Sequence, residues 1–232
     1  MPATRRPSIT MTRTTNAGLY HLFAWLSPGF PIGAFSYSHG LEAEVEAGRV
    51  HDRATLERWI TATIRHGGGR LDADLLRDAY RGEGSHERGL AYRATAELLL
   101  ESSAQGTAFA ATVRAAWAAG PHPPAAARGD ASAGVCHTVA LGQAAAGAGV
   151  TLEDTLTLYL QSFAANLMSA GLRLGVIGQT DGQRILAALE PAIAEAVAAS
   201  ITRDPEDFGA STFAADIASM GHETQYSRLF RS

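Results

Sequence analysis

The chain contains 232 residues, of which 46% are hydrophobic and 18% are charged, and its formal net charge is −4. This length and apolar content predict one folded domain with a substantial core rather than a disordered chain. All 19 basic residues are arginine. The missing lysine excludes P-loop phosphate sites and pyridoxal-phosphate Schiff bases, and the negative charge argues against a nucleic-acid partner.

The first fifteen residues carry Arg5, Arg6 and Arg13 without an acid, and no apolar signal segment follows them. We expect residues 1–15 to form a flexible tail. No apolar run approaches the roughly 18 to 20 residues that cross a bilayer. The expectation is therefore a cytoplasmic chain without a membrane partner.

Helical periodicity dominates the chain from residue 16 onward. Asp52 suits the N-cap position of one predicted helix, because its carboxylate can accept from the first free N–H groups. A proline-rich break is expected over residues 120–129. The shorter predicted helices cover residues 16–26, 39–48, 52–66, 70–80, 86–101, 105–118 and 133–147.

Two longer helices are predicted in the C-terminal half. The first begins after Thr151, which forms a near capping box with Asp154, and its apolar residues recur every three or four positions up to Leu174. The second is expected to begin with Thr180 as its N-cap. Pro191 lies inside its pattern and is expected to kink or divide it, because proline lacks the backbone N–H.

No segment shows the period-2 alternation of a strand. The predicted fold class is all-α, a single-domain bundle of roughly nine or ten helices. We place the helical domain at residues 16–210 and a C-terminal partner-binding tail at residues 211–232.

The sequence offers no catalytic constellation and no cofactor motif. Ser38 lies in a run resembling a nucleophile elbow, but Ser36 stands where that motif needs glycine, so a serine hydrolase is disfavoured. Asp72 and Asp74 lie on different faces of a predicted helix, and we expect a solvated face there. The chain is therefore expected not to be an enzyme.

A metal-binding helical protein remains the alternative. Cys136, His137 and His222 are the candidate ligands, because thiolate and imidazole both suit nickel. Adjacent residues on a helix point about 100° apart, which makes Cys136 and His137 a poor pair for one ion. We accordingly predict no metal ligands as the main reading.

Two segments have the composition of contact surfaces. The run from Ser27 to Glu42 combines prolines, glycines and aromatic residues in a bent connection, which either plugs a core or anchors a partner. The C-terminal run from His222 to Ser232 interleaves aromatic residues with arginine, the types that dominate binding hot spots. A terminal segment folded back onto the core is the equal alternative for the second run.

These two runs carry a family resemblance. The first reads Ser-Pro-Gly-Phe-Pro-Ile-Gly-Ala-Phe-Ser-Tyr-Ser-His-Gly-Leu-Glu and is similar to the N-terminal signature of the UreF family of urease accessory proteins. Matching stretches follow in order at residues 158–174 and 178–183 and in the C-terminal His-Glu-Thr-Gln-Tyr-Ser-Arg-Leu-Phe-Arg-Ser run. Ala34 and His39 depart from the residues usual in the family.

The resemblance implies an all-helical, dimeric chaperone subunit without chemistry of its own. It implies binding to the accessory protein UreD (also called UreH), recruitment and regulation of the GTPase UreG, and nickel insertion into apo-urease. The matched positions are the expected partner contacts: Phe35, Ser36, Tyr37, Ser38, His39, Glu42, Gln179, Asp181, His222, Glu223, Tyr226, Arg228, Leu229, Phe230 and Arg231.

Overall fold

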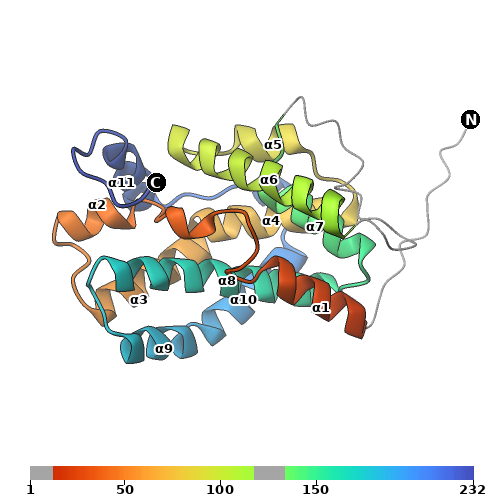
Figure 1. The fold of residues 1–232 in the computed structure, drawn as a ribbon, viewed down its shortest axis with the longest axis horizontal. Coiled ribbons are helices and arrows are strands. Elements are labelled where there is room, and N and C mark those ends of the chain that lie inside the picture. The colour runs from red at the N-terminus through yellow and green to blue at the C-terminus, as the bar shows by residue number, and fades with distance from the viewer. Residues whose placement is uncertain (1–12, 118–133) are drawn as a thin grey trace, which may run out of the picture.

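A computed structural model of the chain describes residues 13–117 and 134–232. Within these ranges the regular elements are all helices (Figure 1), and the predicted all-α fold class is confirmed. The helices are α1 (Asn16–Trp25), α2 (Leu41–Glu46), α3 (Arg53–His66), α4 (Gly68–Arg81), α5 (His86–Ala91), α6 (Ala96–Ala116), α7 (His137–Gly147), α8 (Leu152–Arg173), α9 (Gln179–Ala188), α10 (Glu190–Thr202) and α11 (Phe213–His222), with short 3₁₀ turns at Ala34–Ser36 and Pro205–Asp207.

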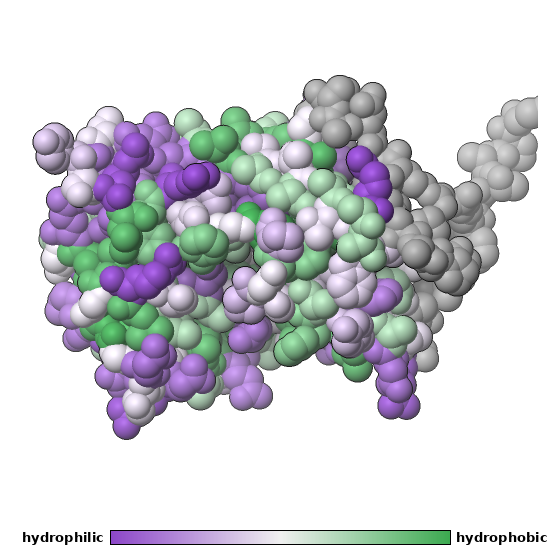
Figure 2. All heavy atoms as spheres, in the orientation of Figure 1, coloured by the Kyte–Doolittle hydropathy of each residue, from purple (hydrophilic) through white to green (hydrophobic). Residues whose placement is uncertain are grey.

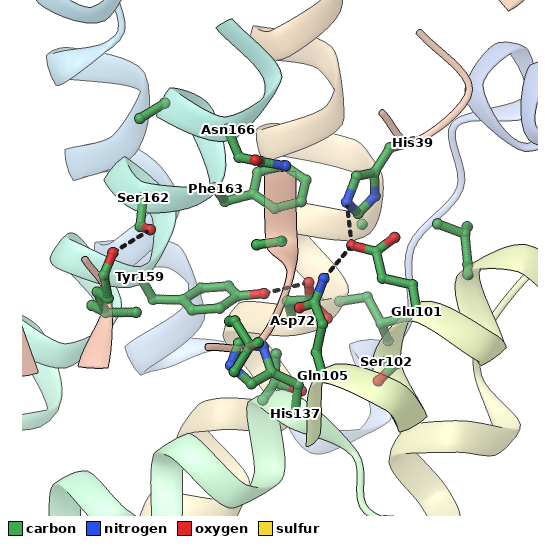
Figure 3. Close-up of a pocket in the computed structure, with 18 of the residues that line it drawn as sticks. His39, Asp72, Glu101, Ser102, Gln105, His137, Tyr159, Ser162, Phe163 and Asn166 are labelled. Carbon is green, nitrogen blue, oxygen red and sulfur yellow. Dashed lines mark hydrogen bonds and ion pairs between the residues drawn. The ribbon is translucent and has the colours of Figure 1, made fainter. Parts of the chain in front are cut away.

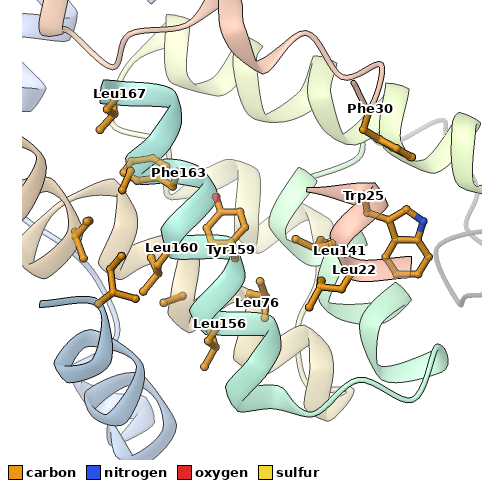
Figure 4. Packing of buried hydrophobic residues seen from close by; sticks show 14 of the residues in the cluster. Leu22, Trp25, Phe30, Leu76, Leu141, Leu156, Tyr159, Leu160, Phe163 and Leu167 are labelled. Atoms are coloured by element: carbon orange, nitrogen blue, oxygen red, sulfur yellow. The ribbon is translucent and has the colours of Figure 1, made fainter. Parts of the chain in front are cut away.

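Helices α4 and α8 form the centre of the bundle. α4 packs against α3, α7, α8 and α10, while α8 also contacts α2 and α9. The side chains of Leu156, Leu160 and Leu167 recur along one face of α8, and all three are 0% exposed. They pack with side chains of α1 and α4 in the main core cluster (Figure 4), so the periodicity of α8 is the periodicity of its buried face.

A glycine brings α4 and α7 into close contact. A Cβ atom placed on Gly142 would lie 2.5 Å from the carbonyl oxygen of Leu76. Any larger residue would force the two helices apart, since real Cβ atoms do not approach that closely. The Ala- and Gly-rich composition of α7 therefore sets a short distance between the helices.

Several predicted helix ends are confirmed. Asp52 caps α3 in a capping box with Thr55, and the Thr151 hydroxyl accepts a hydrogen bond from Asp154 N at the start of α8. Pro191 lies in the first turn of α10, where its missing N–H costs nothing, and the long predicted helix is divided into α9 and α10 next to Leu189.

Other predicted ends are wrong. Thr180 lies inside α9, and Gly178 is the N-cap residue. The predicted break between residues 101 and 105 lies within α6, because the break falls earlier, where Thr95 caps α6 by accepting from Leu98 N.

Two predicted segments have folded parts. The Thr14 side chain is 7% exposed and Thr15 caps α1, so the folded body includes residues assigned to the N-terminal tail. Residues 211–232 contain α11, which the sequence patterns did not separate from the tail. The remaining N-terminal residues, 1–12, and the proline-rich break at 120–129 lie outside the described ranges.

Within the described ranges, no single helix is long and apolar enough to cross a membrane, although the bent pair α9 and α10 reaches that length and composition when joined. Apolar side chains do reach the surface among polar ones on the face drawn in Figure 2. Much of the surface of any protein is apolar, so a single exposed apolar side chain is ordinary. A group of neighbouring exposed apolar side chains indicates a contact surface.

Candidate functional site: a docked C-terminal tail beside a polar cavity

The loop from Ser27 to Gly40, called here the first loop, leads from α1 to α2. Its Phe30 side chain is 8% exposed and lies 5.5 Å from the ring of Phe109, which fixes the loop to the core. At the end of the loop His39 has a φ of 54° and Gly40 a φ of 76°. A Cβ on Gly40 would meet Ser219 N of α11 at 2.8 Å, so glycine is required here by both backbone conformation and close approach.

The C-terminal segment from Glu223 to Ser232, called here the tail, folds back on the first loop and α2. The Glu42 carboxylate accepts hydrogen bonds from Leu229 N at 2.7 Å and Phe230 N at 2.9 Å. The Ser232 carbonyl accepts from Ser38 N at 2.7 Å and also from the Ser38 hydroxyl. The buried Glu42 carboxylate thus accepts from tail backbone N–H groups that have no helical partner.

A second buried carboxylate holds the start of the tail. Glu97 of α6 accepts from Arg228 Nη1 at 2.8 Å and lies 2.8 Å from Nδ1 of His222. The opposite ring nitrogen of His222 lies 3.1 Å from Glu42. His222 is 0% exposed. The last residue of α11, directly before the tail, is therefore a buried histidine that lies between two carboxylates.

The hydrophobic part of this docking is small. The Phe230 side chain is 3% exposed, and the Arg173 guanidinium lies 4.2 Å from its ring centroid. Tyr226 and Leu229 point into solvent, with exposed fractions of 105% and 60%. The tail is therefore held mainly by hydrogen bonds and charge, while two of its large apolar side chains remain uncovered.

A cavity of about 460 Å³ lies next to the docked tail, between the first loop, α6 and α8. Apolar side chains form one part of its wall, and a polar group forms another (Figure 3). Tyr159 donates to Asp72 at 2.7 Å, and Arg93 Nη1 donates to the other oxygen of the same carboxylate at 2.7 Å. The labelled polar residues of the wall are His39, Asp72, Glu101, Ser102, Gln105, His137, Tyr159, Ser162 and Asn166.

Glu101 connects the tail to the cavity. One of its oxygens lies 3.1 Å from His39 Nε2 and accepts from Gln105 at 2.9 Å. Its other oxygen accepts from the Ser232 hydroxyl at 3.2 Å. The docked tail, the first loop and the cavity wall therefore share one carboxylate.

The two cavity histidines have opposite electrostatic environments. Burial lowers the pKa of His39, but the charge and hydrogen bond of Glu101 outweigh burial and raise it. Burial lowers the pKa of His137 to about 4, and His137 Nε2 has no hydrogen-bond partner. Burial therefore favours the uncharged ring of His137, whereas Glu101 favours the protonated ring of His39.

Burial and nearby charges together shift the pKa values of Tyr159 and Cys136. Burial raises the pKa of Tyr159, helped by the Asp72 charge, so the phenol stays protonated and donates. Burial raises the pKa of Cys136, but Arg93 and the neighbouring hydroxyls lower it by more.

The prediction of a solvated face at Asp72 and Asp74 is wrong. These residues are 4% and 0% exposed and belong to the buried polar part of α4.

The structure brings most of the predicted contact residues together in this one region but divides them by exposure. Tyr37, Ser38, Glu42, His222 and Phe230 are buried within the chain, where they hold the loop and tail. The exposed or half-exposed members are Phe35, Ser36, His39, Glu223, Tyr226, Arg228, Leu229 and Arg231. The two remaining predicted residues, Gln179 and Asp181, lie at the start of α9, and none of the hydrogen bonds that hold the tail involves them.

Sequence patterns missed Glu97, Arg93 and Tyr159, which are as central to the region as the predicted residues. The structure shows why they are needed: in α4 acids alternate with apolar residues, and the helix is buried on nearly all sides. An acid in such a helix needs a buried partner, and an arginine or tyrosine elsewhere must supply it.

The metal-binding alternative lacks a ligand set in the described residues. Cys136 lies beside Arg93 and Ser102, whereas His222 lies between Glu42 and Glu97. No three His, Cys, Asp or Glu side chains in the described ranges are arranged to hold a metal ion. Ser38 is likewise 0% exposed with its hydroxyl bonded to Ser232, which leaves it no access to a substrate.

Loop, tail and cavity define an all-helical protein whose polar groups, where the chain is described, hold segments of the chain in place. Comparison with known proteins gives the family. The UreF family model matches residues 50–190. The chain therefore belongs to the UreF family.

Full-length relatives agree with this assignment. The "Urease accessory protein UreF" of Rhodopseudomonas palustris strain BisB5 is 45% identical over 246 residues, covering 100% of both chains. The protein of the same name from strain BisB18 is 46% identical over 225 residues, covering 93% of this chain and 92% of the relative. That of Granulibacter bethesdensis is 42% identical over 228 residues, covering 94% and 96%.

Proposed function

We propose that this chain is a non-catalytic urease maturation subunit. It binds a UreD-type (UreH-type) accessory protein, recruits the UreG-type GTPase and regulates it during nickel insertion into apo-urease. Family membership supports the urease maturation role, because the full-length relatives bear the name urease accessory protein. Nickel is cargo in this proposal, and the protein works as a homodimer in the cytoplasm.

One observation supports contact with a partner at the C-terminal end. Phe213, Ile217 and Met220 recur at the spacing of one helix face on α11 and are 77%, 66% and 52% exposed. The opposite face of the same helix, with Ser219 and His222, is buried against the chain. The inward face of α11 is thus formed by small and polar residues, including Ala218, while its large apolar side chains point outward, unlike an ordinary surface helix.

The tail extends this apolar face. Tyr226 and Leu229 are exposed beside Arg228 and Arg231, and aromatic and arginine side chains make the strongest anchors in protein interfaces. The tail backbone is already fixed by Glu42, so a partner that binds these side chains does not have to order the segment first. We therefore assign the partner contact to the outer face of α11 and to the exposed side chains of the tail.

A paired substitution tests the proposal. Tyr226→Ser with Leu229→Ser removes two exposed anchors without touching the buried Phe230. Because both side chains lie in solvent, the melting temperature is expected to stay within a few degrees of the unmodified chain. Co-purification with UreD and UreG is expected to weaken at least tenfold, and urease activation in a reconstituted assay is expected to fall with it.

A matched control comes from α1, which lies at the other end of the molecule from α11 (Figure 1). Leu19→Ser with Tyr20→Ser removes the same two residue types from another exposed site, where the side chains are 44% and 69% exposed. Partner binding is expected to persist in this control. Normal binding and full urease activation by the Tyr226/Leu229 variant would refute the assignment.

A further inference from the structure

The buried ring of His222 has a hydrogen-bonding requirement that an uncharged imidazole does not meet. Its Nδ1 lies 2.8 Å from Glu97 and its Nε2 lies 3.1 Å from Glu42. The ring is 0% exposed, and the two carboxylate side chains are 10% and 8% exposed. Water is thus excluded as a substitute partner for either ring nitrogen.

A neutral imidazole carries one N–H, whereas an imidazolium carries two. With both carboxylates ionised, only the imidazolium donates to both of them. Loss of one proton would leave a ring lone pair facing a buried carboxylate oxygen, which is repulsive and leaves that carboxylate without its donor. The docked arrangement of these three groups therefore holds one proton.

Both carboxylates also hold the tail. Glu42 accepts from the backbone N–H groups of Leu229 and Phe230, and Glu97 accepts from Arg228. A change in the charge of the three-group cluster acts on these contacts directly. Among the described helices, those packed most closely against α11 are α2 and α6. The ionisable groups that they turn toward the ring are these two glutamates, and the tail adds Arg228 through its pair with Glu97.

We propose that docking of α11 and the tail is linked to the uptake of one proton through His222. In a released segment the histidine would be in water, where it is mostly uncharged above about pH 6.5, and both glutamates would be ionised. Docking therefore binds a proton at neutral pH, and docking weakens as pH rises. This linkage goes beyond the proposed function, since it acts through contacts within the chain whatever partner the tail meets.

The experiment measures hydrogen exchange of the Leu229 and Phe230 amides in the full chain between pH 5.5 and 8.5. Rates are converted to protection factors, which removes the intrinsic pH dependence of exchange. We expect protection to fall by roughly tenfold per pH unit above about pH 6.5, where the released histidine has lost its proton while the docked cluster still holds one. A constant protection factor over this range would overturn the proposal.

Glu97→Gln is the decisive variant. Its amide oxygen still accepts from Arg228, while its NH₂ group donates to a neutral His222 ring, so docking no longer needs the extra proton. We expect its protection factors at pH 8 to stay within threefold of their value at pH 6. A pH-dependent fall as steep as that of the unmodified chain would overturn the proposal.

Two histidine variants serve as controls. His51→Asn changes an exposed histidine and is expected to leave the pH dependence intact. His39→Asn addresses the other histidine that is connected to the tail, through Glu101 and Ser232. If His39→Asn abolishes the pH dependence and Glu97→Gln does not, the proton belongs to His39 and the proposal is wrong.

Discussion

His39 and Glu101 form a contact between the first loop and α6, with Nε2 of the histidine 3.1 Å from Oε1 of the glutamate. The histidine ring also lies at 4.9 Å from Phe163 on α8. This single pair therefore joins three elements at the wall of the cavity, and its charge state is open to measurement.

Replacing Glu101 is expected to lower the pKa of His39. The Glu101 charge and hydrogen bond raise that pKa against the effect of burial, so Glu101→Gln leaves burial to dominate. Because the folded-state pKa is raised, the pair stabilises the fold below about pH 6.5 and loses this effect as pH rises through the folded-state pKa. An NMR titration of His39 checks the shift. Gln105→Met, which removes a neutral partner of Glu101, is the control and is expected to keep the pKa raised.

His137 is expected to make the fold sensitive to acid. Its pKa is about 4 in the folded chain because the ring is buried, so the unfolded chain binds a proton first as pH falls. The free energy of unfolding is expected to decrease by about 3 kcal/mol as pH falls from 6.5 through 4. Denaturation at several pH values measures this, and His137→Phe is expected to remove that share of the loss. An equal loss in His137→Phe and in the unmodified chain would assign the acid sensitivity to other groups.

Alanine substitutions at Gly40 and Gly48 are expected to distinguish the cost of backbone strain from the cost of steric contact. Both have positive φ angles, 76° and 70°, but a Cβ on Gly48 meets nothing within 4 Å, whereas one on Gly40 meets α11. Gly48→Ala is expected to cost about 1 kcal/mol from the left-handed backbone alone. Gly40→Ala is expected to cost about 2 to 4 kcal/mol, because overpacking is added. Urea denaturation compares the two, and equal losses would show that α11 moves aside freely.

Arg93 is expected to be essential for the fold. It pairs with Asp72 at 2.7 Å, and the two side chains are 9% and 5% exposed. Arg93→Met would leave the Asp72 charge buried with only the Tyr159 hydroxyl as a partner, at an expected cost of about 3 to 5 kcal/mol. Arg65→Met removes an exposed pair with Glu195, and an expected cost below about 1 kcal/mol makes it the control. Similar losses in both variants would contradict the role given to burial.

Much of the helical framework follows from local sequence. Asp52 and Thr151 act at helix starts through neighbours three residues away, and Pro191 acts through its own backbone. Such effects are complete within one turn of chain and need no knowledge of the rest of the fold. The predicted start of α9 was wrong because a suitable side chain alone does not make an N-cap. Thr180 has a hydroxyl that could cap a helix, but the helix already begins at Gln179, one residue before it.

The candidate site could be predicted only in part. Glu42 and Phe230 lie in motifs that attracted attention, but the bond between Glu42 and the Phe230 backbone spans 188 positions. Asp72 was wrongly predicted to be exposed, because its burial depends on Arg93 and Tyr159, which approach it from two other segments. Partnerships of this kind arise from tertiary packing, and one sequence without its fold contains no spacing rule that reveals them.

The large separation between the tail and its anchors also has a consequence for synthesis. Glu42 leaves the ribosome 188 positions before Phe230 does, an interval of roughly 10 to 40 s at ordinary rates of translation. Before the tail has been synthesised, Glu42, Glu97 and Glu101 lack the donors that the tail provides. Residues 228–232 supply those partners, so a chain cut before residue 228 would leave all three carboxylates without their tail donors. The three carboxylates can therefore reach their docked arrangement only after the tail has been synthesised.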